Sequence, residues 1–249
     1  GLRSENKAES KPGVILAGSR SCEPQLASDL QKWLLCTHAD TQTRSADDKK
    51  GADSEPQAWV AYVPTASMYL KEDSSSTRSE GERRRRLWAN ARKRGRQLEE
   101  RLGTKVETID LMRSKDQAEL QSQMQGAKAI YVDGGNTFHL LHHIRSSGFD
   151  SVCTQMVNDG CIYVGVSAGA IVAGSSIRTA FWKGWDDPLV VDTDWSKEEN
   201  LRGLNLVPDH AFFPHYDEVE HLGLVRQKRE ELGERDRLVL LGDHDTFML

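Results

Sequence analysis

Short apolar segments rich in β-branched residues alternate along the chain with longer segments whose apolar residues recur every three or four positions. The short segments predict strands and the longer ones predict helices, since side chains repeat every 2 residues on a strand and every 3.6 on a helix. Strands are predicted at residues 13–17, 58–63, 106–111, 127–132, 161–166, 211–215 and 238–241. Helices are predicted at residues 24–35, 84–102, 137–146 and 149–158.

This alternation of strands and helices predicts an α/β fold, in which a mainly parallel sheet carries helices on both faces. We expect one domain over residues 13–249, preceded by a polar extension at 1–12. Two polar segments, near 37–56 and 71–82, interrupt the rhythm and resemble solvated insertions, because they are rich in charged and small polar residues.

The overall charge adds little to this picture. The 249 residues carry a formal net charge of −5, which provides no general attraction to nucleic acid or acidic membranes. No apolar run approaches the 18 residues of a membrane span, and the N-terminal residues lack the apolar stretch of a signal peptide. Together with four irregularly spaced cysteines, read as reduced thiols, these features predict a cytoplasmic protein without a metal site.

A run of arginines at residues 83–86, followed by more basic residues at 92–94, has two interpretations. It is either a nucleic-acid-binding patch or one face of a solvated helix whose charge is offset by neighbouring glutamates. The second interpretation is favoured, because no aromatic ladder or binding motif accompanies the basic residues. We therefore predict no nucleic-acid partner.

The apolar run that begins at Cys161 ends in Gly165-Val166-Ser167-Ala168-Gly169. This pattern predicts a buried strand, a sharp turn and the start of a helix, with the Ser167 hydroxyl projecting at the corner. The first free N–H groups of the helix, including that of Ala168, are suited to stabilising an oxyanion. Ser167 is therefore a candidate nucleophile, although small residues at such a junction often serve only close packing.

A second glycine turn, Gly134-Gly135-Asn136, closes the strand at 127–132 and opens the next helix. Its exposed backbone N–H groups would lie at the carboxyl edge of the sheet, where open α/β folds bind ligands. We expect this turn to supply an oxyanion donor, and Gly134 and Asn136 to line the substrate site. The alternative role of this turn is to cap the helix, and both roles are compatible.

A serine nucleophile needs a base and a carboxylate that orients that base. Of the eight histidines, His215 is the favoured base because it ends an apolar strand, with His210 and His244 as weaker candidates. The search for the acid covers the linker between Ser167 and His215, whose carboxylates are Asp186, Asp187, Asp192, Asp194, Glu198 and Glu199. The turn that carries Asp186 is the most site-like of these, because tryptophans accompany it.

Taken together, several motifs resemble peptidase family S51, which includes the aspartyl dipeptidases (peptidase E) and the cyanophycinases. They are Pro64-Thr65-Ala66-Ser67, Gly134-Gly135-Asn136-Thr137-Phe138, the serine turn at 165–170, Leu204-Asn205-Leu206-Val207-Pro208, and Pro214-His215. The resemblance extends from about residue 13 to the C-terminus. It implies a flavodoxin-like fold related to class I glutamine amidotransferases. The serine turn alone would also fit an α/β-hydrolase, but too few residues separate Ser167 from His215 for that fold.

The resemblance implies Ser167 as nucleophile, His215 as base, Asp186 as the orienting acid, and Gly135 with Ala168 as oxyanion donors. It also implies that Arg226 or Arg229 holds the aspartyl carboxylate of a small peptide substrate, and that no cofactor is needed. A homodimer is left open. A noncatalytic binding module and a cyanophycinase-like hydrolase of β-aspartyl links are the alternative functions.

Overall fold

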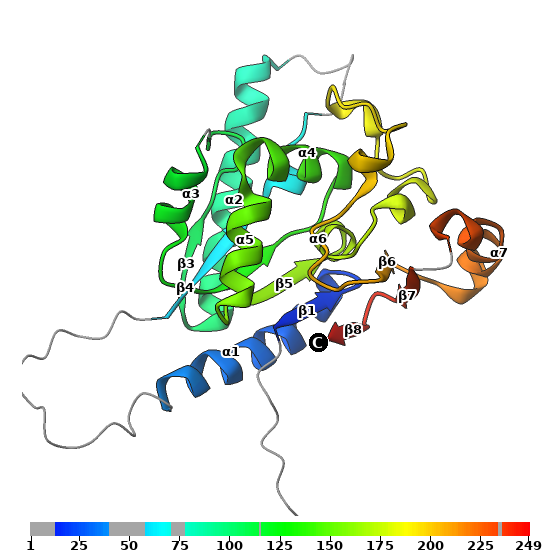
Figure 1. Cartoon of the computed structure of the whole chain (residues 1–249). Helices are drawn as coiled ribbons and strands as arrows, with labels where there is room; N and C mark the ends of the chain where they lie inside the picture. The colour runs from blue at the N-terminus through cyan, green and yellow to red at the C-terminus, as the bar shows by residue number, and fades with distance from the viewer. Residues whose placement is uncertain (1–12, 40–57, 71–77, 115, 234–235) are drawn as a thin grey trace, which may run out of the picture.

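A computed structural model of the chain describes residues 13–39, 58–70, 78–114, 116–233 and 236–249 (Figure 1). Its centre is a six-stranded sheet in the order β3-β2-β4-β5-β1-β8. The strands are β1 (Val14–Ala17), β2 (Trp59–Val63), β3 (Lys105–Thr108), β4 (Ala127–Val132), β5 (Ile162–Val166) and β8 (Thr246–Met248). All neighbours are parallel except β8, which runs antiparallel to β1. The predicted α/β class with a mainly parallel sheet is confirmed.

Helices cover both faces of this sheet. One face packs against α1 (Glu23–Ala39) and α2 (Glu80–Leu102), and the other against α3 (Gln117–Met124), α4 (Thr137–Ser147), α5 (Phe149–Asn158) and α6 (Ala168–Ala173). Alternate residues of β2 divide between the two cores, with Val60 and Tyr62 on one face and Ala61 and Val63 on the other. None of the described helices is long and apolar enough to cross a membrane.

A separate two-stranded parallel sheet lies beside the main one. It consists of β6 (His210–Pro214) and β7 (Arg237–Leu241), with α7 (Glu218–Lys228) between them in sequence. A small apolar cluster that includes Trp182, Phe213 and Val225 fills the space between this sheet and α7. The strands predicted at 211–215 and 238–241 therefore exist, but they pair with each other rather than extending the main sheet.

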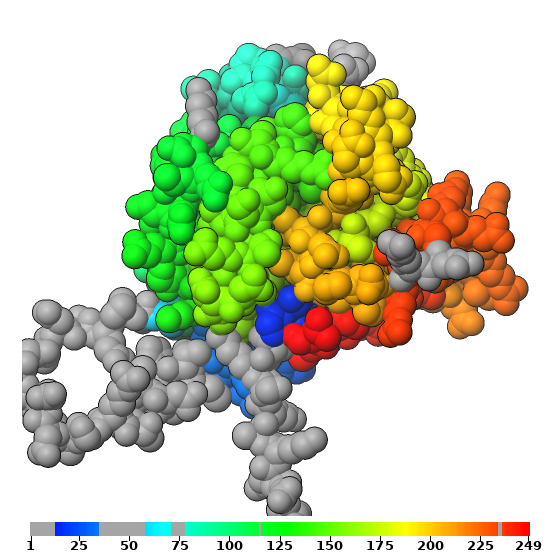
Figure 2. Space-filling view, viewed as in Figure 1, coloured from blue at the N-terminus to red at the C-terminus, as the bar shows by residue number. Residues whose placement is uncertain are grey.

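The long connection from α6 to β6 contains only short 3-10 helices: η3 (Arg178–Phe181), η4 (Pro188–Val190) and η5 (Glu198–Leu201). In Figure 2 its later part (yellow) lies at the surface, and η4 contacts α4. Arg145 of α4 ties the connection down by donating to the backbone carbonyls of Glu199, Asn200 and Arg202. Further hydrogen bonds from the Asn136 side chain to the Asp187 carbonyl and from the Thr137 N–H to Asp186 hold this part of the connection next to the serine turn.

The structure differs from the sequence prediction in several elements, among them α2, α3 and β8. Helix α2 begins at Glu80, because Ser79 and Glu82 form a reciprocal capping box, so the polar segment predicted at 71–82 ends before this point. Helix α3 was not predicted, since its eight residues contain few apolar positions. Strand β8 was also missed because it has only three residues. Residues 40–57 and 71–77 of the predicted insertions lie outside the described residues.

Candidate active site

Ser167 occupies a sharp turn between β5 and α6, as the sequence predicts. Its backbone has φ +51° and ψ −107°, a conformation that side-chain-bearing residues rarely adopt. The turn is held because the Ser167 N–H donates to the Ala17 carbonyl, and the Ser167 carbonyl accepts from Ala170 and Ile171. A Cβ on Gly169 would lie 2.3 Å from the Val132 carbonyl oxygen, so only glycine permits this close packing. The turn therefore holds Ser167 at the carboxyl end of β5.

His215 follows β6 and also has a positive φ, of +53°. Its Nε2 lies 2.9 Å from the Ser167 hydroxyl oxygen, and its Nδ1 lies 2.7 Å from Oδ1 of Asp243. The side chain of His215 is 30% exposed and that of Asp243 is 56% exposed. Serine, histidine and aspartate thus form a continuous hydrogen-bonded chain at one end of the sheet.

The position of Asp243 depends on the turn that joins β7 to β8. The carboxylate of Asp245 accepts from the Gly242 N–H, which closes the turn. The backbone carbonyl of Asp243 accepts from the Ser19 hydroxyl at 2.8 Å, which joins this turn to the segment after β1. Asp243 is therefore fixed through its backbone while its carboxylate reaches His215.

The sequence prediction that Asp186 orients His215 is corrected by this geometry. Asp186 instead accepts a hydrogen bond from the Thr137 N–H, at the first turn of α4. Burial raises the pKa of its carboxyl, and the hydrogen bond from Thr137 opposes this increase. Asp243 was missed because only acids between Ser167 and His215 were considered. Its sequence signal is that it follows the strand predicted at 238–241 by two residues, at a sheet edge.

The turn after β4 lies against Ser167. A Cβ on Gly134 would come within 3.0 Å of the Ser167 Cβ, and one on Gly135 would lie 2.2 Å from the Ala66 carbonyl oxygen. Gly135 has φ +148°, in the region that favours glycine. Among the described residues, the N–H groups of Gly135 and Ala168 have no hydrogen-bond acceptor. Both are consequently available as donors beside the serine.

Asn136 has a structural role that the sequence prediction treated as an alternative. Its side-chain oxygen caps α4 by accepting from the His139 N–H, and its side-chain nitrogen donates to the Asp187 carbonyl. The residue is 1% exposed. Because both ends of its amide are engaged within the protein, the expectation that Asn136 contacts substrate is not supported.

The two arginines considered for substrate binding also lie elsewhere. Arg226 is exposed on the last turn of α7 and does not line either cavity next to Ser167. Arg229 donates to the backbone carbonyls of Gly233 and Asp236. The other histidine candidates are likewise displaced, since His210 bonds the Pro208 carbonyl and His244 is exposed.

Two cavities meet at Ser167 and His215. The larger, of about 630 Å³, is lined by Ser19, Arg20, Ser21, Ser67, Tyr69, Gly134, Gly135, Val166, Ser167, His215 and Asp243. The smaller, of about 40 Å³, lies toward the connection that carries Lys183, Trp185 and Asp186. The serine hydroxyl is thus accessible to a small molecule from the larger cavity.

Lys183 lines the smaller cavity and contacts the histidine segment directly. Its Nζ donates to the carbonyls of Pro214 at 2.8 Å and of His215 at 2.6 Å, and it lies over the rings of Trp185 and Phe213. Burial lowers the pKa of Lys183 to about 8, and the charges of Asp243 and Glu220 act in the opposite direction. The lysine fixes the backbone on which His215 sits.

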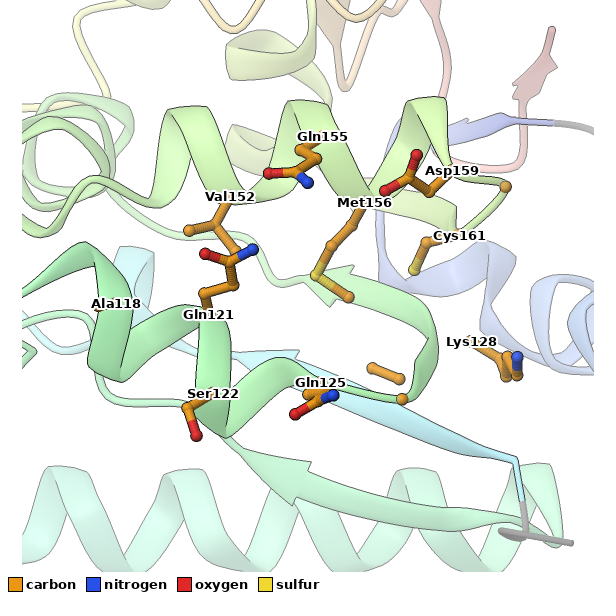
Figure 3. Close-up of a pocket in the computed structure, with 13 residues that line it drawn as sticks. Ala118, Gln121, Ser122, Gln125, Lys128, Val152, Gln155, Met156, Asp159 and Cys161 are labelled. Carbon is orange, nitrogen blue, oxygen red and sulfur yellow. The ribbon is translucent and has the colours of Figure 1, made fainter.

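A third cavity, of about 710 Å³, lies between α3 and α5 (Figure 3). Its labelled side chains include Gln121 of α3, Gln125 directly after α3, and Gln155 and Met156 of α5. It contains no histidine beside its one serine, Ser122, so the arrangement seen at Ser167 is not repeated there. Among the described residues, no group of three or more His, Cys, Asp and Glu is placed to hold a metal ion.

Comparisons with known proteins identify the family of this chain. The sequence matches peptidase family S51 over residues 49–237. It is 27% identical to an uncharacterized peptidase of Listeria monocytogenes over 62% of this chain and 72% of that protein. It is 32% identical to peptidase E of Nostoc over 57% of this chain and 52% of that enzyme. A crystal structure of a Listeria monocytogenes protein provisionally described as a peptidase E superimposes with a TM-score of 0.59. That pair is 23% identical, and the superposition covers 95% of this chain and 93% of the other.

Proposed function

Because the chain belongs to peptidase family S51, we propose that it is a serine peptidase that cleaves short peptides from a free N-terminus. The observation that carries this proposal is the hydrogen-bonded series from Ser167 through His215 to Asp243, with distances of 2.9 and 2.7 Å. A serine hydroxyl becomes nucleophilic only when a base takes its proton. His215 is placed to do so, and the Asp243 carboxylate favours the tautomer with the proton on Nδ1.

In the proposed mechanism, the Ser167 oxygen attacks the scissile carbonyl carbon while His215 Nε2 accepts the hydroxyl proton. The Gly135 and Ala168 N–H groups donate to the resulting oxyanion. The tetrahedral intermediate then collapses, and His215 transfers its proton to the departing amine, leaving an ester on Ser167. A water molecule, deprotonated by His215, hydrolyses this ester and restores the serine.

We propose dipeptides with an N-terminal aspartate as the preferred substrates. The peptidase E relatives and the motifs shared with that family support this choice. The small cavity beside Ser167 suits a short side chain, and Lys183 contributes a positive charge there. Larger N-terminal side chains would have to displace Trp185 or Phe213.

The test is hydrolysis of dipeptides with N-terminal Asp, Glu, Leu or Ala by the wild type and by Ser167→Ala, together with labelling by a fluorophosphonate. We expect Asp-selective turnover and labelling in the wild type, and loss of both in a folded Ser167→Ala protein. Labelling with turnover of other N-termini would retain the peptidase and reject the aspartate preference. Absence of both labelling and turnover in the wild type would refute the proposal and favour a noncatalytic binding module.

A further inference from the structure

Arg20 reaches from the segment after β1 to the end of β4. Its Nε and Nη2 each lie 2.9 Å from a different carboxylate oxygen of Asp133. Asp133 is fully buried and also accepts from the Tyr62 hydroxyl at 2.7 Å. An arginine held by two hydrogen bonds to a buried and further bonded carboxylate has little freedom to move. The guanidinium of Arg20 is therefore fixed in orientation.

Arg20 also lines the large cavity that contains Ser167. The Arg20 side chain is 51% exposed, and its Nη1 has no hydrogen-bond acceptor among the described residues. Because a guanidinium has five N–H donors, the sideways pairing with Asp133 leaves the two Nη1 donors and one Nη2 donor at its end. Parallel N–H groups at the end of an arginine match the two oxygens of a carboxylate.

The charges around Arg20 leave its positive charge incompletely neutralised. Asp133 is shared with Arg94, whose Nε lies 3.9 Å away, and Glu23 pairs with both Arg94 and Arg101. Three arginines therefore face two carboxylates in this cluster. Burial raises the pKa of Tyr62, which keeps its hydroxyl neutral. The cluster has a formal charge of +1, and Arg20 is its member that lines the cavity with Ser167.

Arg20 is also linked to Ser167 through Asp133 and the glycine turn that follows it. Asp133, its anchor, directly precedes Gly134, whose added Cβ would lie 3.0 Å from the Ser167 Cβ. The large cavity contains Arg20 and Ser167 together with Gly135, so a single small peptide can contact all three.

We propose that Arg20 binds a carboxylate of the substrate in this cavity and thereby selects for short, negatively charged peptides. The inference rests on the proposed peptidase function, whose site it extends. The carboxylate is the C-terminus of a dipeptide when the N-terminal aspartate side chain occupies the small cavity, and that side chain when the aspartate lies in the large cavity instead. Arg20 is then a specificity-determining residue rather than only the partner of Asp133.

The test measures binding by calorimetry in the Ser167→Ala background, which does not turn substrate over. The ligands are Asp-Leu, its C-terminal amide, and the amide of Asn-Leu, so that each carboxylate is removed in turn. Hydrogen bonds to charged groups contribute about 1.5–3 kcal/mol, so removal of the recognised carboxylate should weaken binding by about 10- to 150-fold. The step at which affinity falls identifies the C-terminus or the side chain as the source.

Arg20→Met should abolish the difference in affinity between the peptides with and without the recognised carboxylate, because it weakens binding of the former alone. Arg20→Lys should restore part of that difference. Arg94→Met is the matched control, because it removes another cation from Asp133 but not a group that lines the cavity. Equal weakening of charged and neutral peptides by Arg20→Met, no dependence on either carboxylate, or no peptide binding would each overturn the proposal. Fluorophosphonate labelling of the wild type tests the peptidase function separately, since that probe carries no carboxylate.

Discussion

Replacement of Asp243 tests which carboxylate orients the proposed base. Asp243 Oδ1 lies 2.7 Å from His215 Nδ1, whereas Asp186 accepts from the Thr137 N–H. An asparagine at 243 has nearly the shape of aspartate, but its amide nitrogen can donate to Nδ1. This donation would favour the tautomer whose proton is on Nε2, which cannot accept the Ser167 proton. Asp243→Asn should therefore be more damaging than Asp243→Ala.

The expected magnitudes follow from the geometry. A hydrogen bond to a charged group contributes about 1.5–3 kcal/mol, so Asp243→Ala should lower kcat/KM by about 10- to 150-fold. The lower part of this range is expected because the Asp243 side chain is 56% exposed and water screens its charge. For Asp243→Asn, the unfavourable tautomer extends the loss toward about 10⁴-fold. Asp186→Asn should lose less than about tenfold, because its amide oxygen can still accept from Thr137.

The assay is steady-state kcat/KM on the best-cleaved dipeptide, with thermal unfolding followed by circular dichroism to confirm that each variant is folded. The ratios convert directly into lost transition-state stabilisation. A loss above about a thousandfold in Asp186→Asn, combined with less than about tenfold in Asp243→Asn, would refute the assignment of Asp243 as the orienting acid.

Three further predictions concern groups around the site. Burial lowers the pKa of His139 to about 3. Below pH 6.5 the unfolded chain therefore binds more protons than the folded protein, and the stability decreases as the pH is lowered. Urea unfolding should show about 2 kcal/mol less loss between pH 7 and pH 5 in His139→Leu than in the wild type, and equal losses would contradict this. Burial lowers the pKa of Lys183 to about 8, so the folded protein releases this proton first and the wild type should gain stability over Lys183→Met from pH 8 to pH 10. A fall in the unfolding free energy of the wild type relative to that of Lys183→Met over this pH range would show the reasoning to be wrong. Gly135→Ala should lower kcat/KM by about 100-fold or more, because its Cβ would overlap the Ala66 carbonyl and shift an oxyanion donor. Gly160→Ala, at another positive φ but in open space, is the control and should retain wild-type activity.

Most of the main sheet was predictable because its signals are local. The apolar runs of β2, β4 and β5 are buried on both faces, so each stands out in the sequence without knowledge of its neighbours. Helix α2 was recognised from its length, but its first turn was not, since the capping box at Ser79 lies in a polar segment. Strand β8 is formed by three residues that pair with β1, and nothing in its own composition distinguishes it from a turn.

The same distinction separates the residues of the candidate site. Ser167 and His215 were identified because each ends a run of apolar residues, and both lie at strand ends in the structure. Asp243, Arg20 and Lys183 were not assigned to the site, because their contacts are made with residues that are remote in sequence. Arg20 and Asp133, for example, are separated by 113 positions.

Short-range chemistry in the chain is therefore enough to specify the α/β class, the serine turn and the histidine that follows an apolar strand. These features depend on residues that are adjacent or a few positions apart. Which acid bonds His215 depends instead on the pairing of β6 with β7, which brings the turn after Leu241 beside His215. Many acids along the sequence are chemically equivalent, and only strand pairing and chain closure select the one whose carboxylate reaches the imidazole.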